Sequence, residues 1–126
     1  MVSKETIEAY FRNLQDEICS GLEKTDGKAK FKQDLWSRPE GGGGRTRIIQ
    51  DGDIIEKGGV NFSAVFGDCP EFLKKEAGIS GSERIQFLAT GVSLVIHPNH
   101  PFVPIIHMNV RYFEAGNMWW LISSWV

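Results

Sequence analysis

The sequence predicts an α+β fold in which a large, mainly antiparallel sheet is flanked by helices. Up to about residue 26 the apolar side chains recur at helical spacing, whereas from Lys30 onward they alternate with polar ones in short runs. Tight, glycine-containing turns separate most of these runs, and such connections favour antiparallel pairing of consecutive strands. Only one long helix is expected, and one helix is too little to cover the apolar face of such a sheet. We therefore expect the architecture to be incomplete in this chain.

The amino-terminal segment predicts an amphipathic helix of about twenty residues. Ser3 is a candidate amino-terminal cap, and Asp26-Gly27 is a typical stop signal. The charged side of this helix is expected to face solvent. The apolar residues at helical spacing are Ile7, Tyr10, Phe11, Leu14, Ile18 and Leu22.

The rest of the chain predicts strands and their connections. Asp51-Gly52, between two pairs of isoleucines, predicts a two-residue hairpin. Gly91 is expected to form a bulge or bend within its strand. Residues 69–81 are expected to form a loop with at most a helical turn. The strands are expected at 31–37, 45–50, 60–66, 85–97, 105–113 and 118–123.

Composition narrows the classes of protein. The 126 residues suit one domain, and 41% hydrophobic with 24% charged residues is typical of globular proteins. A net charge of −2 lacks the basic excess of nucleic-acid-binding proteins. No apolar run reaches the ~18 residues that span a bilayer, and the start is too polar for a signal peptide, so we expect a cytoplasmic protein. Cys19 and Cys69 lack metal or redox spacing and are expected to be buried.

Two neighbouring strands carry an unusual set of polar side chains. Strand alternation places His107, Asn109 and Arg111 on one face, and Ser93 and His97 on one face of the preceding strand. If these strands pair across the proline-flanked connection, the five side chains converge. Histidine, amide, hydroxyl and guanidinium groups together suit a carboxylate ligand with a proton donor at hand. The alternative is an ordinary solvated face.

A glycine-rich segment is the second candidate site. Residues 41–44 are consecutive glycines, which can leave backbone N–H groups open to a ligand. Arg38, Arg45 and Arg47 beside them suit carboxylates. The segment is no Walker A loop, and Thr46 occupies the third glycine position of a dinucleotide motif. The alternative is a flexible loop with incidental arginines.

Other polar and aromatic residues give weaker signals. Asn61 and Ser63 either extend a pocket or face solvent. The pair Trp119-Trp120 is expected to pack in the core. Metal binding through His97 and His107 is geometrically feasible, but two ligands are too few for a closed site.

Five stretches follow one another along the chain: WSRPEGGGGRTR at 36–47, EKGGVNFS at 56–63, GVSLVIHP at 91–98, PFVPIIHMNVRYF at 101–113 and the pair Trp119-Trp120. In their order and spacing these stretches resemble the oxygen-dependent coproporphyrinogen III oxidases. The resemblance covers nearly the whole chain up to Trp120.

The resemblance implies a cytoplasmic bacterial homodimer of haem biosynthesis. Members convert two propionates of coproporphyrinogen III to vinyl groups, giving protoporphyrinogen IX and carbon dioxide. Molecular oxygen is the co-substrate, and no organic cofactor is expected. A divalent metal cation is implied for bacterial members, at the histidines that match His97 and His107.

The resemblance also implies roles for single residues. Ser93 resembles the family's residue that contacts the substrate, and His107 resembles its proton donor. The run Asn109, Val110 and Arg111 resembles the strand that binds the substrate. We add Arg45 and Arg47 as candidate substrate-binding residues from their place beside the glycines.

The chain departs from the family after Trp120. Members continue with Phe-Gly-Gly-Gly, a variable residue and Asp-Leu-Thr-Pro, whose aspartate is thought to meet the pyrrole nitrogens, whereas residues 121–126 read LISSWV. We therefore expect residues 1–126 to be the amino-terminal portion of a single domain whose carboxy-terminal half is absent. The alternative function is a truncated, catalytically incompetent fragment that binds tetrapyrroles or anions. A third, weaker interpretation is a sheet domain that mediates interactions.

Overall fold

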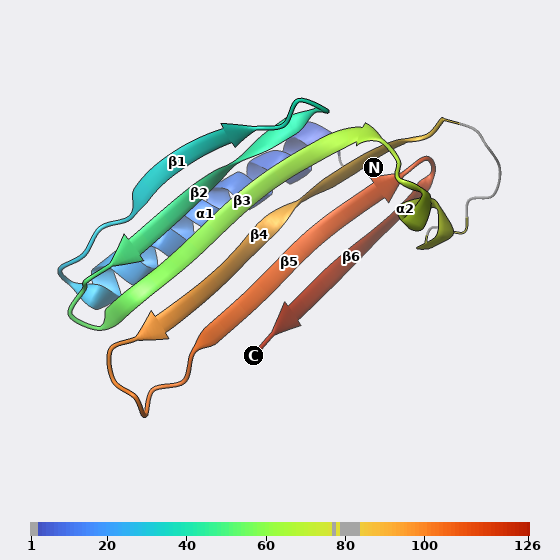
Figure 1. Cartoon of the computed structure of the whole chain (residues 1–126). Helices are drawn as coiled ribbons and strands as arrows, with labels where there is room; N and C mark the ends of the chain where they lie inside the picture. The colour runs from blue at the N-terminus through green and yellow to red at the C-terminus, as the bar shows by residue number, and fades with distance from the viewer. Residues whose placement is uncertain (1–2, 77, 79–83) are drawn as a thin grey trace.

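One long helix lies across one face of a six-stranded antiparallel sheet (Figure 1). The structure, a computed structural model, describes residues 3–76, 78 and 84–126. The strands follow one another across the sheet in the order β1-β2-β3-β4-β5-β6, so each pairs with its neighbour in the sequence. This arrangement confirms the predicted α+β class. The elements are α1 (Lys4–Asp26), β1 (Lys32–Ser37), β2 (Gly42–Gln50), β3 (Ile55–Asp68), α2 (Glu71–Glu76), β4 (Gln86–Pro98), β5 (Ile106–Ala115) and β6 (Met118–Trp125).

Both ends of α1 lie where the sequence predicts them. The Ser3 hydroxyl accepts a hydrogen bond from the backbone N–H of Thr6, at 3.3 Å. At the other end Gly27 adopts a φ of 81°, and its N–H donates to the carbonyl of Glu23 at 3.0 Å. The left-handed conformation suits glycine, which explains why the helix ends at this residue.

The core fills the space between α1 and one face of the sheet, which we call the helix face. Even-numbered residues of β3 and β4 point into it, and Val60 and Phe62 are almost fully buried. The opposite side, which we call the open face, is not covered by α1 (Figure 1). The buried apolar residues of this core are Phe11, Cys19, Ile49, Ile55, Val60, Phe62, Ala64, Leu88, Val92, Leu94, Ile96 and Tyr112.

The connection between β2 and β3 is longer than predicted. Gln50 pairs with Lys57, and the loop covers residues 51–54 instead of the two residues Asp51-Gly52. Asp51 adopts a φ of 59°, which an aspartate tolerates better than most residues. The hairpin prediction is therefore confirmed, but its two-residue turn is wrong.

The glycine run belongs mainly to the sheet, so the predicted open loop is wrong. Gly41 and Gly42 adopt φ values of 132° and 87°, and β2 begins at Gly42. Gly43 and Gly44 pair with residues of both β1 and β3. A β-carbon on Gly44 would collide with the ring of Trp36. The glycines therefore allow close approach between strands and side chains.

Gly91 causes no bulge, because the pairing of β4 with both neighbours is continuous there. The register shift in this part of the sheet lies between Ile55 and Lys57 instead. A β-carbon on Gly91 would collide with the backbone of Val110 and lie 2.8 Å from the α-carbon of Arg111. Gly91 therefore provides space for the neighbouring strand.

The remaining predictions concern a loop, the cysteines and the membrane. The predicted helical turn is α2; residues 77 and 79–81 of that loop lie outside the described residues. Cys19 and Cys69 are buried and free, as predicted, and burial raises the pKa of both thiols. None of the helices in the described ranges is long and apolar enough to cross a membrane.

Candidate functional site

Four of the predicted site residues gather on the open face. β4 pairs with β5 across the proline-flanked connection, which puts Ser93 opposite Asn109 and Val95 opposite His107. Arg111 lies opposite Gly91 on the same face. All four polar side chains are half-buried. The predicted convergence of Ser93, His107, Asn109 and Arg111 is confirmed.

A line of polar side chains crosses the open face at right angles to the strands. We call it the polar row. Each member lies directly opposite the next in the register of five consecutive strands, from β2 to β6. Its members are Thr46, Asn61, Ser93, Asn109 and Ser124.

The carbonyl oxygens of both asparagines in the polar row already accept hydrogen bonds. The hydroxyl of Thr46 donates to Oδ1 of Asn61 at 2.7 Å, and itself accepts from Nε1 of Trp36 at 3.1 Å. On the other side, Nε of Arg111 donates to Oδ1 of Asn109 at 3.0 Å. Each asparagine therefore offers a ligand its amide NH2 group, which is a donor.

The row next to the polar row carries small residues at its centre. Gly44, Ser63 and Gly91 lie directly opposite one another on β2, β3 and β4, between Trp36 on β1 and Arg111 on β5. The indole of Trp36 lies against Gly44 and the side chain of Arg111 lies against Gly91, so these two side chains border the row at either end.

Aromatic rings border the open face beyond Arg111. Phe113 and Trp120 lie opposite each other on β5 and β6, and their rings stack with centroids 5.4 Å apart and planes 12° apart. Trp120 is half-buried. The prediction that Trp119 packs in the core is wrong, because Trp119 is 55% exposed on the helix face, where it stacks on Tyr112. The tryptophans alternate along a strand, so only one can point to each face.

Trp119 lines an apolar groove of about 640 Å³ on the helix face. The groove runs between the first turns of α1 and strands β5 and β6, with Ile7 and Tyr10 on the helix side. Val110 lines it too, so the side chain of this predicted substrate-binding residue points away from the polar row. Val110 can meet a ligand of the open face only through its backbone.

His97 lies on the open face but at its margin. It pairs with Lys57 of β3, one step beyond Val95, which faces His107. The two histidines are therefore diagonal neighbours on β4 and β5. Across the part of the chain that the structure describes, no three His, Cys, Asp or Glu side chains are grouped as metal ligands. The donors present do not fit a closed metal site, and we assign no chemical step to a metal.

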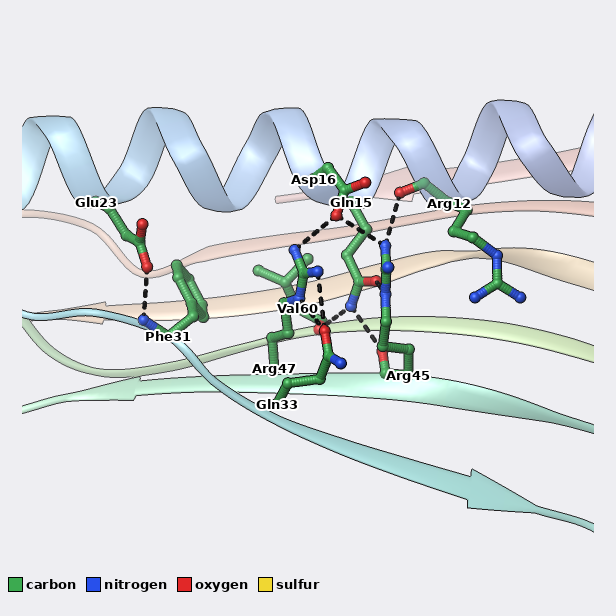
Figure 2. A network of polar contacts seen from close by, with 9 residues as sticks. All are labelled: Arg12, Gln15, Asp16, Glu23, Phe31, Gln33, Arg45, Arg47 and Val60. Atoms are coloured by element: carbon green, nitrogen blue, oxygen red, sulfur yellow. Dashed lines mark hydrogen bonds and ion pairs between the residues drawn. The ribbon is translucent and has the colours of Figure 1, made fainter.

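Arg45 and Arg47 point to the helix face, away from the polar row. Both guanidinium groups contact Oδ1 of Asp16 on α1, at 2.9 Å and 2.8 Å (Figure 2). Arg45 also donates from Nε to Oε1 of Gln15 at 2.7 Å, and Arg47 to Oε1 of Gln33 at 3.0 Å. Arg45 and Arg47, predicted as substrate-binding residues, are therefore not brought together with Ser93, Asn109 and Arg111 on the open face. Arg45, Arg47 and Ile49 are spaced two residues apart, so strand alternation puts their side chains on the same face. The expected burial of Ile49 was therefore the signal in the sequence that could have placed the arginines.

Gln15 joins α1 to the sheet. Its side chain is fully buried, and Nε2 donates to the carbonyls of Arg45 at 2.6 Å and Val60 at 2.9 Å (Figure 2). The carbonyl oxygen of the same amide accepts from Arg45. The hydrogen-bonding groups of this buried amide are thus engaged, as polar burial requires.

Comparisons with known proteins identify the family of the chain. The family model described as coproporphyrinogen III oxidase matches residues 6–125. The chain belongs to this family. Oxygen-dependent coproporphyrinogen-III oxidases from two strains of Prochlorococcus marinus are 46% and 51% identical to it, over 94% and 85% of the chain. One from a Synechococcus species is 47% identical over 94% of the chain.

The match to these coproporphyrinogen oxidases is partial on their side. The chain covers 34% and 30% of the two Prochlorococcus proteins and 32% of the Synechococcus protein. It therefore spans about a third of the length of the curated relatives it matches. The matched chain contains the polar row, the pair Trp119-Trp120 of β6 and the histidines of β4 and β5.

Proposed function

We propose that this chain is part of an oxygen-dependent coproporphyrinogen III oxidase, which converts two propionates of coproporphyrinogen III to vinyl groups and yields protoporphyrinogen IX. The observation that carries the proposal is the family match over residues 6–125. The polar row supports it, because a tetracarboxylate needs several hydrogen-bond donors on one surface.

The proposed reaction balances without an organic cofactor. Each propionate side chain loses its carboxyl group as carbon dioxide. It also loses the equivalent of a hydride from its β-carbon, the carbon bonded to the pyrrole ring. One molecule of oxygen accepts those two electrons together with two protons and becomes hydrogen peroxide. One proton comes with the hydride equivalent, and the other comes from solvent or an acid. The electron-rich pyrroles of the substrate can react with oxygen directly.

Four residues have roles in this proposal. Arg111 clamps a carboxylate with its guanidinium group, and Ser93 and Asn109 donate hydrogen bonds beside it. His107, one step along β5 from Asn109 on the same face, transfers a proton at its imidazole. We leave out Arg45 and Arg47, whose guanidinium groups are bound to α1.

We also propose that the complete enzyme works in the cytoplasm as a homodimer, as the resemblance implies. The support within this chain is the large exposed apolar surface of β6, on which Leu121 is 64% and Trp125 is 79% exposed. Sedimentation velocity measures the oligomeric state. A strictly monomeric protein that contains this chain and the rest of the domain would exclude the dimer.

An anaerobic-to-aerobic assay tests the catalytic proposal. Coproporphyrinogen III is mixed with the protein under nitrogen, oxygen is admitted, and vinyl products and hydrogen peroxide are quantified. We expect His107→Ala to lower turnover by about 10²- to 10⁴-fold, the range for loss of a proton-transfer group. Unchanged turnover would remove His107 from the reaction.

The second candidate function is tetrapyrrole binding without turnover. The observation that favours it is the set of hydrogen-bond donors along the polar row, which can hold carboxylates without a chemical step. Coproporphyrin III, the stable fluorescent analogue, distinguishes the two functions. Binding with no product in the aerobic assay supports the second function, and product formation supports the first.

A further inference from the structure

We infer that Asn61 is a further substrate-binding residue, which donates its amide NH2 to a carboxylate of the tetrapyrrole, and that Trp36 and Thr46 are positioning residues that orient it. The inference rests on the proposed function, because it assigns Asn61 to the same ligand. From the sequence alone, Asn61 is expected either to extend a pocket or to face solvent.

Asn61 lies in the polar row close to Ser93 and Asn109. In the sheet register Asn61 lies directly opposite Ser93, which lies directly opposite Asn109. Opposite side chains on one face of an antiparallel pair have β-carbons about 4.5–5.5 Å apart. The three polar groups therefore lie within about 10 Å of one another, close enough to contact one carboxylate or two adjacent ones. All three are half-buried, so each remains accessible.

Hydrogen bonds through Thr46 set the direction of the Asn61 amide. An indole nitrogen only donates, so Thr46 accepts from Trp36 with a lone pair and keeps its single hydrogen for another partner. That partner is Oδ1 of Asn61, 2.7 Å away. The carbonyl side of the amide is thus directed to β2. Its NH2 side is turned away from Thr46, and β4 with Ser93 is the neighbouring strand on that side.

Gly44 supports this chain of hydrogen bonds by leaving space for Trp36. The indole of Trp36 lies against Gly44, where a β-carbon would collide with the ring. Trp36 and Gly44 are directly opposite in the register of β1 and β2. The glycine therefore provides the space in which the indole reaches Thr46. One function of the glycine-rich segment is to seat Trp36.

The groups around Ser93 define the chemistry of the ligand. Asn61 and Asn109 flank Ser93 on either side, and a donor holds the carbonyl oxygen of each: Thr46 for the first and Arg111 for the second. The flanking asparagines therefore present N–H groups, and Arg111 adds a positive charge. Such a surface favours an acceptor-rich anion over a cation or a neutral donor. A propionate carboxylate has this chemistry.

Substitutions at Asn61 and Thr46 test the inference. The measured quantity is the affinity for coproporphyrin III, determined by quenching of porphyrin fluorescence. Asn61→Asp replaces the NH2 with an oxygen but can still accept from Thr46, and it should weaken binding by about tenfold to hundredfold. Thr46→Val removes the hydroxyl at constant shape and should weaken binding less. Thr46→Ser restores the hydroxyl and should restore affinity. Asn13→Asp makes the same chemical change on the exposed side of α1 and is the matched control.

Each result decides something. Equal affinity of N61D and the unsubstituted protein overturns the inference and leaves the proposed function standing. Failure of the unsubstituted protein to bind coproporphyrin III overturns both. A loss of affinity in T46V that T46S does not reverse would remove Thr46 as a positioning residue. Circular dichroism and thermal melting of every variant identify any loss of affinity that comes from unfolding, and Asn61→Ser then provides a smaller substitution for the same measurement.

Discussion

The carboxylate of Asp26, the last residue of α1, accepts a hydrogen bond from the backbone N–H of Ile55 at the start of β3, with 2.8 Å between Oδ1 and the nitrogen. Asp26 is only 3% exposed. The same carboxylate accepts from the N–H groups of Ala29 and Ile54, each at 2.9 Å, and also from Lys28 and Asp53. One side chain therefore fixes both the exit from α1 and the loop between β2 and β3.

Replacement of Asp26 by asparagine should destabilise the fold. Asparagine keeps one carbonyl oxygen, but its NH2 group would face backbone N–H groups that then lack an acceptor. Because buried donors without a partner cost about 1–3 kcal/mol each, we expect a loss of roughly 2–4 kcal/mol in the free energy of unfolding. Urea titration followed by circular dichroism measures it. Lys24→Gln, an exposed change in the same helical turn, is the control and should change stability little.

Asp26 should also make stability depend on acid. Hydrogen bonds from Ala29 and from the loop amides hold the pKa of Asp26 well below its usual 3.8, against the opposing effect of burial. A carboxyl group whose pKa is lower in the folded protein stabilises it above the unfolded pKa, and this contribution disappears as the pH falls toward the folded value. Below about pH 4 the unsubstituted protein should lose up to about 1.4 kcal/mol per pH unit through this group.

The D26N variant isolates that contribution. All other carboxylates are the same in both proteins. The difference in unfolding free energy between them should therefore shrink as the pH falls from about 5 to about 2.5, an interval of roughly one unit on either side of the unfolded pKa. A difference that stays constant over this interval would contradict the role of Asp26 as a buried, ionised acceptor.

Gln15→Met should cost about 2 kcal/mol of stability, because the shape is kept while the hydrogen bonds to the Arg45 and Val60 carbonyls disappear. Chemical unfolding measures the loss. Glu17→Met, at an exposed position of the same helix, is the matched control. Equal midpoints for the two variants would show that the buried amide contributes nothing beyond its volume.

Two glycines should respond in opposite directions to alanine. Gly44→Ala places a β-carbon against the ring of Trp36 and should destabilise the protein by about 1–3 kcal/mol. Gly21 lies within α1 with nothing within 4 Å of its would-be β-carbon, so Gly21→Ala should stabilise by roughly 0.5–1 kcal/mol. Thermal melts of both variants measure the signs, and a stabilising Gly44→Ala would disprove the close contact with Trp36.

The parts of the fold that follow from local chemistry were predictable. Ser3 and Gly27 cap α1 as expected, because capping depends on neighbouring backbone groups alone. The pairing of β4 with β5 followed from one short connection, and it carried Ser93 and Asn109 onto one face. These features require no knowledge of distant residues.

The parts that depend on contacts distant in sequence were harder to predict. The glycines were interpreted as a loop, because nothing local reveals that the Trp36 ring needs the space above Gly44. The partners of Arg45 are Gln15 and Asp16, about thirty residues earlier, and no local pattern identifies them. The hydrogen bonds from Trp36 through Thr46 to Asn61 join three strands, and only the register of these strands brings the three residues together.

The consecutive strand order also has a consequence for how the protein folds. Each strand can form its hydrogen bonds with the segment that has just preceded it, so the sheet can grow one hairpin at a time with modest loop-closure entropy. The contacts of α1 with β3 and β4 span a longer stretch of chain. We therefore expect the hairpins to form early and the docking of α1 to come late, which would make substitutions at Gln15 act mainly on the unfolding rate.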